Sequence, residues 1–260
     1  MRKHFGKLVV GILALSMTAA LLTGCSSKKK DSSKWVIGTN AEFPPFEYIS
    51  KADGVIDNYA GIDMELIKLI AEDNDKTVTI NNMEFDSLII SLNNKQVDAC
   101  IAGMTVTDER KEEVDFSTPY YVATQVMIVN EGSDIEKATD MKDKTIAVVQ
   151  GYTGETVVKE LGYEYEAFKK GTEAIEELKN KKCDVVVIDS ATAAAYLNEN
   201  KGLAIVEDKD AFSSEEYAIA VKKGDKETLD AINKSIEKFK EDGTIDKLAE
   251  KYAEAGSTAE

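Results

Sequence analysis

Two stretches of the chain, LNNKQVD at residues 92–98 and LKNKKCD at residues 178–184, share one layout. Each contains a helix end, a polar turn and an aspartate, and an apolar run typical of a buried strand comes next. The strand ends five residues after the aspartate, at Gly103 in the first copy and Asp189 in the second. Open α/β sheets bind ligands at the carboxyl ends of their strands, so two such units facing each other would place Gly103 and Asp189 across one cleft. The alternative is chance similarity between two ordinary helix–strand units.

Short β-branched runs alternate with amphipathic helices on both sides of these stretches, which predicts an α/β fold. The expected strands are residues 35–39, 77–81, 97–102, 145–149, 184–188 and 217–221. The expected helices are residues 61–73, 85–93, 154–161, 173–180, 191–198, 226–242 and 245–253. Thr107 is expected to be the N-cap of a short charged turn over residues 108–114.

The composition excludes several classes of function. The 260 residues carry a formal net charge of −16, and nucleic-acid binding needs a concentrated positive field, so no nucleic-acid partner is expected. The one histidine, His4, lies in a stretch that resembles a removable leader. The mature chain would then have no imidazole, which excludes Ser-His-Asp and Cys-His catalysis and histidine metal sites. We therefore expect a protein that is not an enzyme and needs no metal or other cofactor.

Residues 1–24 have the layout of a signal peptide, with a cationic start and an apolar segment over residues 8–22. The segment ends in LTGC at residues 22–25, which resembles the lipobox of bacterial lipoproteins. Cys25 is therefore predicted to carry palmitate-type acyl chains, and residues 25–34 to form a flexible tether. Two acyl chains suffice for stable anchoring, so we expect a protein lipid-anchored on the extracytoplasmic face of the cell membrane. The alternative is an ordinary buried cysteine after a signal anchor.

A few side chains could carry chemistry, each with a plainer alternative. Arg110 suits bidentate capture of a carboxylate, or is an exposed arginine of a charged helix. Asp189 could bind an ammonium group or cap the helix that follows it. The turn GYTG at residues 151–154 offers backbone N–H groups to an anion, or is a simple turn. Phe43 and Phe85 each follow a strand, where they could enclose a ligand or pack in the core.

Two other cysteines lie inside or beside strand-like runs, Cys100 and Cys183. We expect both to be small buried residues. A disulfide between them is the alternative in an exported protein.

Several ordered motifs resemble those of the polar amino-acid-binding proteins of ABC importers, solute-binding protein family 3. They are GTNAEFPPFEY at 38–48, GIDMEL at 61–66, FD at 85–86, AGMTVTDER at 102–110, VDFSTPYY at 114–121, QGYTG at 150–154 and ID at 188–189. The resemblance covers residues 35–253. It implies an α/β, two-lobed, type II periplasmic-binding-protein clamp with two crossover strands, at residues 121–129 and 217–221. It also implies a receptor that binds a free polar L-amino acid and delivers it to an ABC permease.

The resemblance also implies how the chain divides into lobes. Residues 35–122 together with 217–256 would form lobe 1, and residues 123–216 would form lobe 2. The protein is expected to act as a monomer.

The resemblance assigns roles to particular residues. In the family, the position of Arg110 binds the ligand α-carboxylate, with Thr105 and the backbone near Thr153, and the position of Asp189 binds the α-ammonium group with the Gly103 carbonyl. The positions of Phe43 and Phe85 flank the ligand side chain. The predicted ligand-binding residues are Asn40, Phe43, Phe85, Ala102, Gly103, Thr105, Arg110, Gln150, Thr153, Gly154 and Asp189.

One position departs from the family pattern. Many relatives, including those that bind basic amino acids, have aspartate in the first loop, where this chain has Asn40. Glu42 could replace the lost charge and Gln150 could add a polar contact, so both basic and glutamine-like ligands stay open. Two other functions also stay open: a dehydratase-like enzyme with Glu42 or Glu84 as general acid, and a sensory amino-acid-binding lipoprotein.

Overall fold

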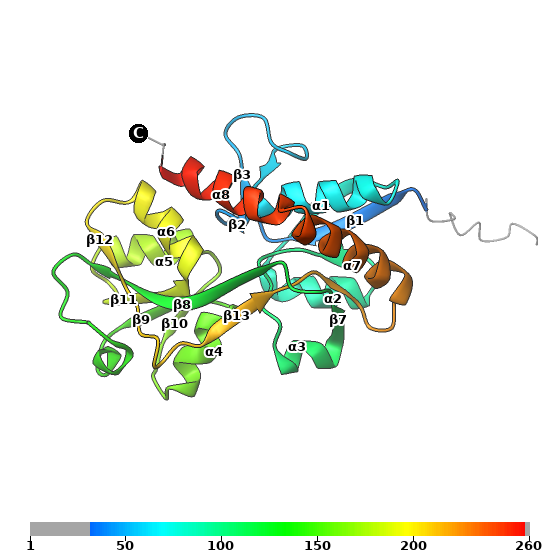
Figure 1. The fold of residues 1–260 in the computed structure, drawn as a ribbon. Coiled ribbons are helices and arrows are strands. Elements are labelled where there is room, and N and C mark those ends of the chain that lie inside the picture. Colours follow the sequence, from blue (N-terminus) through cyan, green and yellow to red (C-terminus); the bar gives the residue numbers. More distant parts are fainter. Residues whose placement is uncertain (1–31, 258–260) are drawn as a thin grey trace, which may run out of the picture. The chain divides into compact units, whose positions relative to one another are not determined.

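The structure is a computed structural model that describes residues 32–257, with side chains described up to residue 253 (Figure 1). The predicted signal peptide, the predicted lipid attachment at Cys25 and most of the predicted tether lie outside the described residues. None of the helices within residues 32–257 is long and apolar enough to cross a membrane.

The first sheet has five strands in the order β5-β1-β6-β14-β7. Its strands are β1 (Lys34–Thr39), β5 (Thr77–Asn82), β6 (Ala99–Cys100), β7 (Val114–Phe116) and β14 (Ala220–Lys222). β1 runs parallel to β5 and β6, whereas β14 runs antiparallel to β6 and β7. Its associated helices are α1 (Ile62–Asp73), α2 (Leu88–Asn93), which follows the short helix η1 (Phe85–Ser87), α3 (Asp108–Glu113), α7 (Lys226–Glu241) and α8 (Thr244–Ser257). α1 corresponds to the helix predicted over residues 61–73; on the apolar face of Ile62, Leu66, Leu69 and Ile70, all but Leu69 are buried, and Leu69 is half-buried.

The second sheet has the order β10-β9-β11-β8-β12, and β13 pairs with one end of β8. Its strands are β8 (Tyr121–Asn130), β9 (Ile146–Val149), β10 (Glu166–Phe168), β11 (Val185–Asp189), β12 (Leu203–Val206) and β13 (Ser214–Tyr217). The helices around it are η2 (Ala138–Met141), α4 (Thr153–Glu160), α5 (Gly171–Lys179) and α6 (Ser190–Glu199). β9 is parallel to β10 and β11, and β8 is antiparallel to β11 and β12.

The two similar stretches adopt the same local structure, one in each sheet. Asp98 accepts the N–H of Val36 at 2.9 Å through Oδ2, and Asp184 accepts the N–H of Thr145 at 2.8 Å in the same way. Lys95 and Lys181 also share a left-handed backbone, with φ of 60° and 58°. Asp98 directly precedes β6 and Asp184 directly precedes β11, the middle strands of the two sheet orders. Each aspartate joins the start of that strand to the neighbouring strand, so the similarity of the two stretches has a structural basis.

Two antiparallel strands connect the sheets, and Figure 1 shows them side by side. β13 pairs with the first residues of β8, with Tyr217 opposite Tyr121. The structure places the return crossing at Ser214–Tyr217, whereas the prediction was residues 217–221; Ala220 and Val221 instead pair within the first sheet. The polar sequence of β13 has no strand signal of its own, because its strand conformation depends on pairing with β8.

Other elements also differ from the prediction. The strand expected over residues 97–102 is limited to Ala99–Cys100, because the chain leaves the sheet toward Gly103, whose φ is 52°. A third sheet, not predicted, joins β2 (Glu42–Phe43), β3 (Glu47–Ile49) and β4 (Tyr59–Ala60). Thr107 is the N-cap of α3, as predicted, and accepts the N–H of Arg110 at 3.1 Å.

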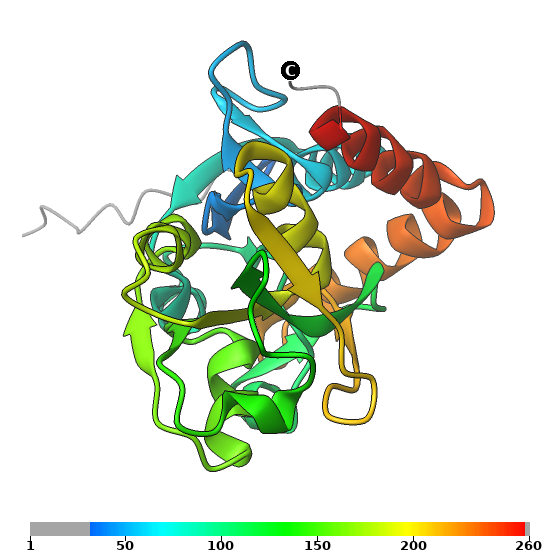
Figure 2. The same ribbon diagram turned by 90° about the vertical axis from the view of Figure 1, so that its left-hand side faces the viewer.

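The C-terminal helices α7 and α8 pack against α1, and Figure 2 shows them, orange and red, along one side of the first sheet.

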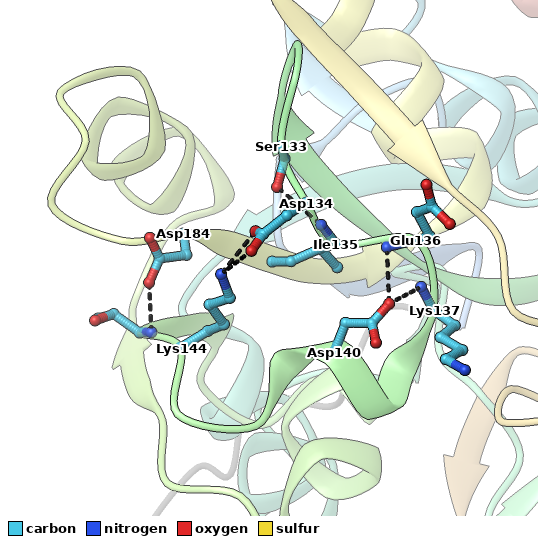
Figure 3. Close-up of polar contacts among 9 residues, drawn as sticks. Ser133, Asp134, Ile135, Glu136, Lys137, Asp140, Lys144 and Asp184 are labelled. Carbon is cyan, nitrogen blue, oxygen red and sulfur yellow. Dashed lines mark hydrogen bonds and ion pairs between the residues drawn. The ribbon is translucent and has the colours of Figure 1, made fainter.

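The connection from β8 to β9 is held by polar contacts (Figure 3). Asp134 accepts two hydrogen bonds from Lys144 at 2.6 and 2.9 Å, and Asp140 accepts the N–H groups of Glu136 and Lys137 at 3.1 Å. These contacts fix the approach to β9, which leads directly to residues 150–154.

Cys100 and Cys183 are free and buried, so the disulfide alternative is wrong. Burial raises the pKa of both thiols to about 12. At neutral pH both are therefore inert thiols.

Candidate ligand-binding site

One small cavity brings together most of the predicted site residues. It is lined by Phe43, Phe85, Ala102, Gly103, Thr105, Arg110, Tyr152, Thr153 and Asp189. Its volume of about 10 Å³ corresponds to the room that one water molecule needs. A ligand larger than water therefore requires the surrounding segments to move apart.

The cavity lies where strands of both sheets end. Gly103 follows β6 of the first sheet, Asp189 is the last residue of β11, and Thr153 begins the helix after β9. The structure thus places Gly103 and Asp189 at one cavity, in the arrangement that the two similar stretches predict.

Arg110 is directed into this region and is held there by three contacts. Its guanidinium donates from Nη1 to the Thr105 carbonyl at 2.7 Å and from Nη2 to the Gly151 carbonyl at 2.9 Å. It also lies 5.0 Å from the ring centre of Phe85, within the range of a cation–π contact. Burial lowers the pKa of Arg110, and the nearby Asp189 carboxylate opposes that shift. The alternative of an exposed surface arginine is therefore wrong.

Asp189 is a buried carboxyl group, only 3% exposed. Its Oδ1 accepts a hydrogen bond from the Tyr217 hydroxyl. Burial raises its pKa, and the neighbouring Glu215 carboxylate raises it further. Asp189 occupies the N-cap position of α6, but its side chain makes no capping hydrogen bond, so capping does not explain this buried acid.

The turn at residues 150–154 contributes a side chain that the sequence did not single out. The Tyr152 ring makes edge contacts with Phe43 and Phe85, at centroid distances of 5.2 and 4.8 Å. Its hydroxyl donates to Asn40 Oδ1 at 2.8 Å. Tyr152 therefore fills the space between the two phenylalanines. The prediction considered only the backbone of this turn, although a bulky residue next to Gly151 was a signal for such a role.

Two further residues at the site come from the crossing strands. Glu215 of β13 accepts hydrogen bonds through Oε2 from the hydroxyls of Thr105 at 2.8 Å and Thr153 at 2.7 Å. Gln125 of β8 donates to Thr153 Oγ1 at 3.0 Å and to Glu215 at 3.4 Å. Alternation along β13 offers a signal for Glu215, because it lies two residues before the buried Tyr217 and so on the same strand face.

Three predicted residues lie beside the cavity and are not among its lining residues. Asn40 is buried and donates to the Met83 carbonyl at 2.9 Å. Gln150 is exposed and donates to Asp86 at 3.3 Å. Gly154 allows α4 to approach β11 closely, because a Cβ there would lie 2.7 Å from the Val187 carbonyl oxygen.

Two of the polar groups considered for other roles, Glu42 and the Gly151 N–H, have partners within the protein. Glu42 forms an ion pair with Lys170 at 2.7 Å. The N–H of Gly151 donates to Glu155 at 2.7 Å. Within residues 32–257, no group of three or more His, Cys, Asp or Glu residues is arranged to hold a metal ion.

The two sheets, the paired crossing strands and the cavity at the strand ends define a two-lobed clamp of the periplasmic-binding-protein class. The chain belongs to the bacterial extracellular solute-binding proteins, family 3, whose family model matches residues 35–255. The predicted family and fold class are thus confirmed.

Similar proteins support this assignment. A probable histidine-binding protein of Neisseria gonorrhoeae is 35% identical, with 92% of this chain and 93% of the relative covered. The arginine-binding extracellular protein ArtP of Bacillus subtilis (strain 168) is 33% identical, with 97% and 98% covered. The solved structure of an ancestral arginine-binding protein bound to glutamine is 41% identical and superposes with a TM-score of 0.78, with 85% of this chain and 97% of that chain covered. All three are named as binding proteins, in agreement with the prediction of a protein that is not an enzyme.

Proposed function

We propose that this protein is an extracytoplasmic receptor that binds one free polar L-amino acid between two lobes and delivers it to the permease of an ABC importer. The observation that carries this proposal is that Arg110 and Asp189 line the same cavity. An amino-acid zwitterion has one group for each of them: a carboxylate for the guanidinium and an ammonium group for the carboxylate. The names of the relatives support the same ligand class.

The carboxylate end of the ligand would lie against Arg110, Thr105 and Thr153. In the structure, the guanidinium donates to backbone carbonyls and the threonine hydroxyls donate to Glu215. An incoming α-carboxylate would take over some of these donors. A guanidinium binds a carboxylate more strongly than a neutral carbonyl, so this exchange at Arg110 favours the bound state.

The ammonium end would lie between Asp189 and the Gly103 carbonyl. Asp189 needs to be ionised for this contact, and the ligand cation stabilises its ionised form. Without a ligand, burial and the Glu215 carboxylate both disfavour ionisation of Asp189. The binding of an ammonium group therefore adds a direct cationic partner to a buried acid that accepts a hydrogen bond from the Tyr217 hydroxyl.

The charges at the site restrict the ligand class. Two carboxylates, Asp189 and Glu215, lie near a single guanidinium, Arg110. The ligand α-carboxylate would be the third carboxylate at the site, so a fourth from an acidic side chain would be repelled, whereas a neutral or cationic side chain would not. We therefore propose a basic or glutamine-like amino acid and exclude glutamate and aspartate as preferred ligands.

Binding would proceed by closure of two lobes, residues 35–122 with 217–256 and residues 123–216. Contacts between these two parts include Arg110 to Gly151, Tyr152 to Asn40 and Lys170 to Glu42. Their separation would open the small cavity at the paired crossing strands. A ligand favours closure only through contacts that it makes better in the closed state, and the opposed groups Arg110 and Asp189 supply those contacts.

We also propose that the receptor acts as a monomer, held at the membrane by a lipid on Cys25. The lipobox-like sequence and the polar stretch after it support this anchor.

A thermal-shift screen of the purified protein against the common L-amino acids tests the proposal. A ligand present at a hundred times its dissociation constant adds about 2.7 kcal/mol to the unfolding free energy. We expect this shift with basic or glutamine-like amino acids. If no amino acid raises the melting temperature, the proposed ligand class is wrong.

A further inference from the structure

Two buried acidic side chains lie next to residues that line the cavity. Glu47 of β3 and Asp63 of α1 are both 0% exposed. Among the described residues, neither carboxyl group forms an ion pair with a lysine or arginine. A buried ionised carboxylate without a cation is strongly disfavoured, so the protonation state of this pair needs an explanation.

The two acids differ in the hydrogen bonds that their oxygens accept. Asp63 Oδ2 accepts the N–H of Gly103 at 2.8 Å and the hydroxyl of Tyr120 at 2.9 Å. Asp63 Oδ1 and both Glu47 oxygens have no hydrogen-bond partner among the described residues. An ionised carboxylate is only an acceptor, so if both groups were ionised, three buried oxygens would lack a donor. One proton on Glu47 supplies a donor for Asp63 Oδ1 and leaves one Glu47 oxygen, that of the uncharged carbonyl, without a partner among the described residues.

We propose that Glu47 is protonated and donates this hydrogen bond to an ionised Asp63, and that the resulting acid pair positions the Gly103 peptide of the ligand site. The uneven contacts identify the proton carrier. Two hydrogen bonds from Gly103 and Tyr120 stabilise the Asp63 anion, whereas Glu47 receives none from residues 32–257 that would stabilise its anion.

The surrounding charges agree with this assignment. Within the described part of the chain, the titratable groups that act electrostatically on the pair are Tyr120, Asp189 and Tyr152, and none of these three is a cation. Burial raises the pKa of Glu47 well above its ordinary value, and the Asp63 carboxylate raises it further. Burial also raises the pKa of Asp63, to about 6, although the hydrogen bonds that it receives oppose this shift. At neutral pH the two groups together hold one proton, on Glu47.

The acid pair is linked to the ligand site through two residues, Gly103 and Phe43. The N–H of Gly103 is bonded to Asp63, and Gly103 lines the cavity. Glu47 lies opposite Phe43 in the β2–β3 pairing, and Phe43 also lines the cavity. Gly103 and Phe43 are in close contact, because a Cβ on Gly103 would lie 2.5 Å from the Phe43 ring. The acid pair is therefore attached to two adjoining walls of the site, and Glu47 and Asp63 act as positioning residues.

The protonation of Glu47 can be tested without any ligand, by comparing the pH dependence of unfolding of the wild-type protein and E47Q. A glutamine amide donates to Asp63 at every pH, as the protonated acid does. The folded-state pKa of Glu47 is raised, so its contribution to stability is complete below the unfolded value of about 4.5 and is lost as pH rises through the folded-state value. The folding constant of E47Q relative to wild type should rise about tenfold per pH unit above pH 4.5, up to the folded-state pKa.

Two results would overturn the protonation. One is a ratio of folding constants that does not change with pH, which means that Glu47 ionises in the folded protein as it does in the unfolded chain. The other concerns the infrared difference spectrum at neutral pH, wild type minus E47Q. It should contain the carbonyl band of a protonated carboxyl group, and a spectrum with only carboxylate bands contradicts the proposal.

The positioning role rests on the proposed function and needs a ligand, for which we choose L-arginine and L-glutamine as probes. E47Q should bind the probe within about twofold of wild type, and D63A, which removes the acceptor of the Gly103 N–H, should bind at least about tenfold more weakly, a loss of about 1.4 kcal/mol. Circular dichroism establishes that each variant is folded. Wild-type affinity in D63A, or an equal loss in E47Q and D63A, overturns the positioning role. If neither probe nor any other amino acid binds the wild-type protein, the proposed function fails, while the unfolding experiment still decides the protonation of Glu47.

Discussion

The Tyr152 hydroxyl donates to Asn40 Oδ1 at 2.8 Å, and this bond joins the start of α4 to the end of β1. It also holds the Tyr152 ring between Phe43 and Phe85. The family resemblance assigns the space between these two phenylalanines to the ligand side chain. Tyr152 must therefore move, or leave only part of this space free, when a ligand binds.

Replacement of Tyr152 should change the selectivity for side-chain length. In Y152A the space between Phe43 and Phe85 is larger, so the affinity for L-arginine relative to L-alanine should increase about tenfold, about 1.4 kcal/mol. Y152F is the matched control, because it keeps the ring and loses only the bond to Asn40, with a stability cost on the order of 1 kcal/mol. Competition binding measures the ratio. An unchanged ratio in Y152A would show that the ring does not limit the ligand.

The affinity for amino acids should depend on pH through Asp189. Its pKa is raised by burial, and the ligand ammonium group needs its ionised form. The affinity is therefore expected to be highest above this pKa and to fall as pH decreases through it, by up to tenfold per pH unit. In D189N the affinity should be lower and this pH dependence absent. Calorimetric titrations at several pH values measure both effects, and an equal pH profile in D189N would assign the titration to another group.

Glu215 should contribute to the rejection of acidic ligands. It is bonded to Thr105 and Thr153, the residues expected to receive the ligand carboxylate, and it brings a second negative charge to the site. Wild-type protein should bind L-glutamate at least about tenfold more weakly than L-glutamine, about 1.4 kcal/mol. E215Q should reduce this difference. E216Q is the neighbouring control, because Glu216 is exposed on the other face of the same strand. The charge argument fails if E215Q and E216Q discriminate equally.

The lipid anchor has a simple test in cells. Cys25 provides the thiol to which the lipid would be attached, so in C25S the protein should leave the membrane fraction and appear in the soluble extracytoplasmic fraction. Fractionation followed by immunodetection measures the distribution. Retention of C25S in the membrane fraction would mean that another segment anchors the chain.

Elements with strong local signals were predictable from the sequence. Helix α1 and the cap of α3 at Thr107 lie where periodicity and capping rules place them. The similarity around Asp98 and Asp184 predicted that Gly103 and Asp189 lie at one cavity, because each aspartate fixes the start of a central strand in its sheet. These features depend on contacts within a few residues or on one repeated pattern.

The remaining features depend on contacts between distant parts of the chain. The polar residues of β13 become a strand by pairing with β8, and this pairing directs Glu215 toward Thr105 and Thr153. The ring of Tyr152 is placed by Phe43, Phe85 and Asn40, which come from other segments. Alternation along β13 and the bulky residue next to Gly151 are signals that become useful only once these distant contacts are known, so Glu215 and Tyr152 were not among the predicted site residues.

Calorimetric titration of R110A is the most direct test of the central claim that Arg110 binds the ligand α-carboxylate. Truncation of this side chain leaves a buried ligand carboxylate without its partner, at a cost of about 2–5 kcal/mol. The control is K111A, which removes the neighbouring cation that pairs with Asp108 on the exposed surface of α3. We expect K111A to bind as wild type does, and R110A to lose about 30-fold to several-thousand-fold in affinity. Wild-type affinity in R110A would contradict the assigned site.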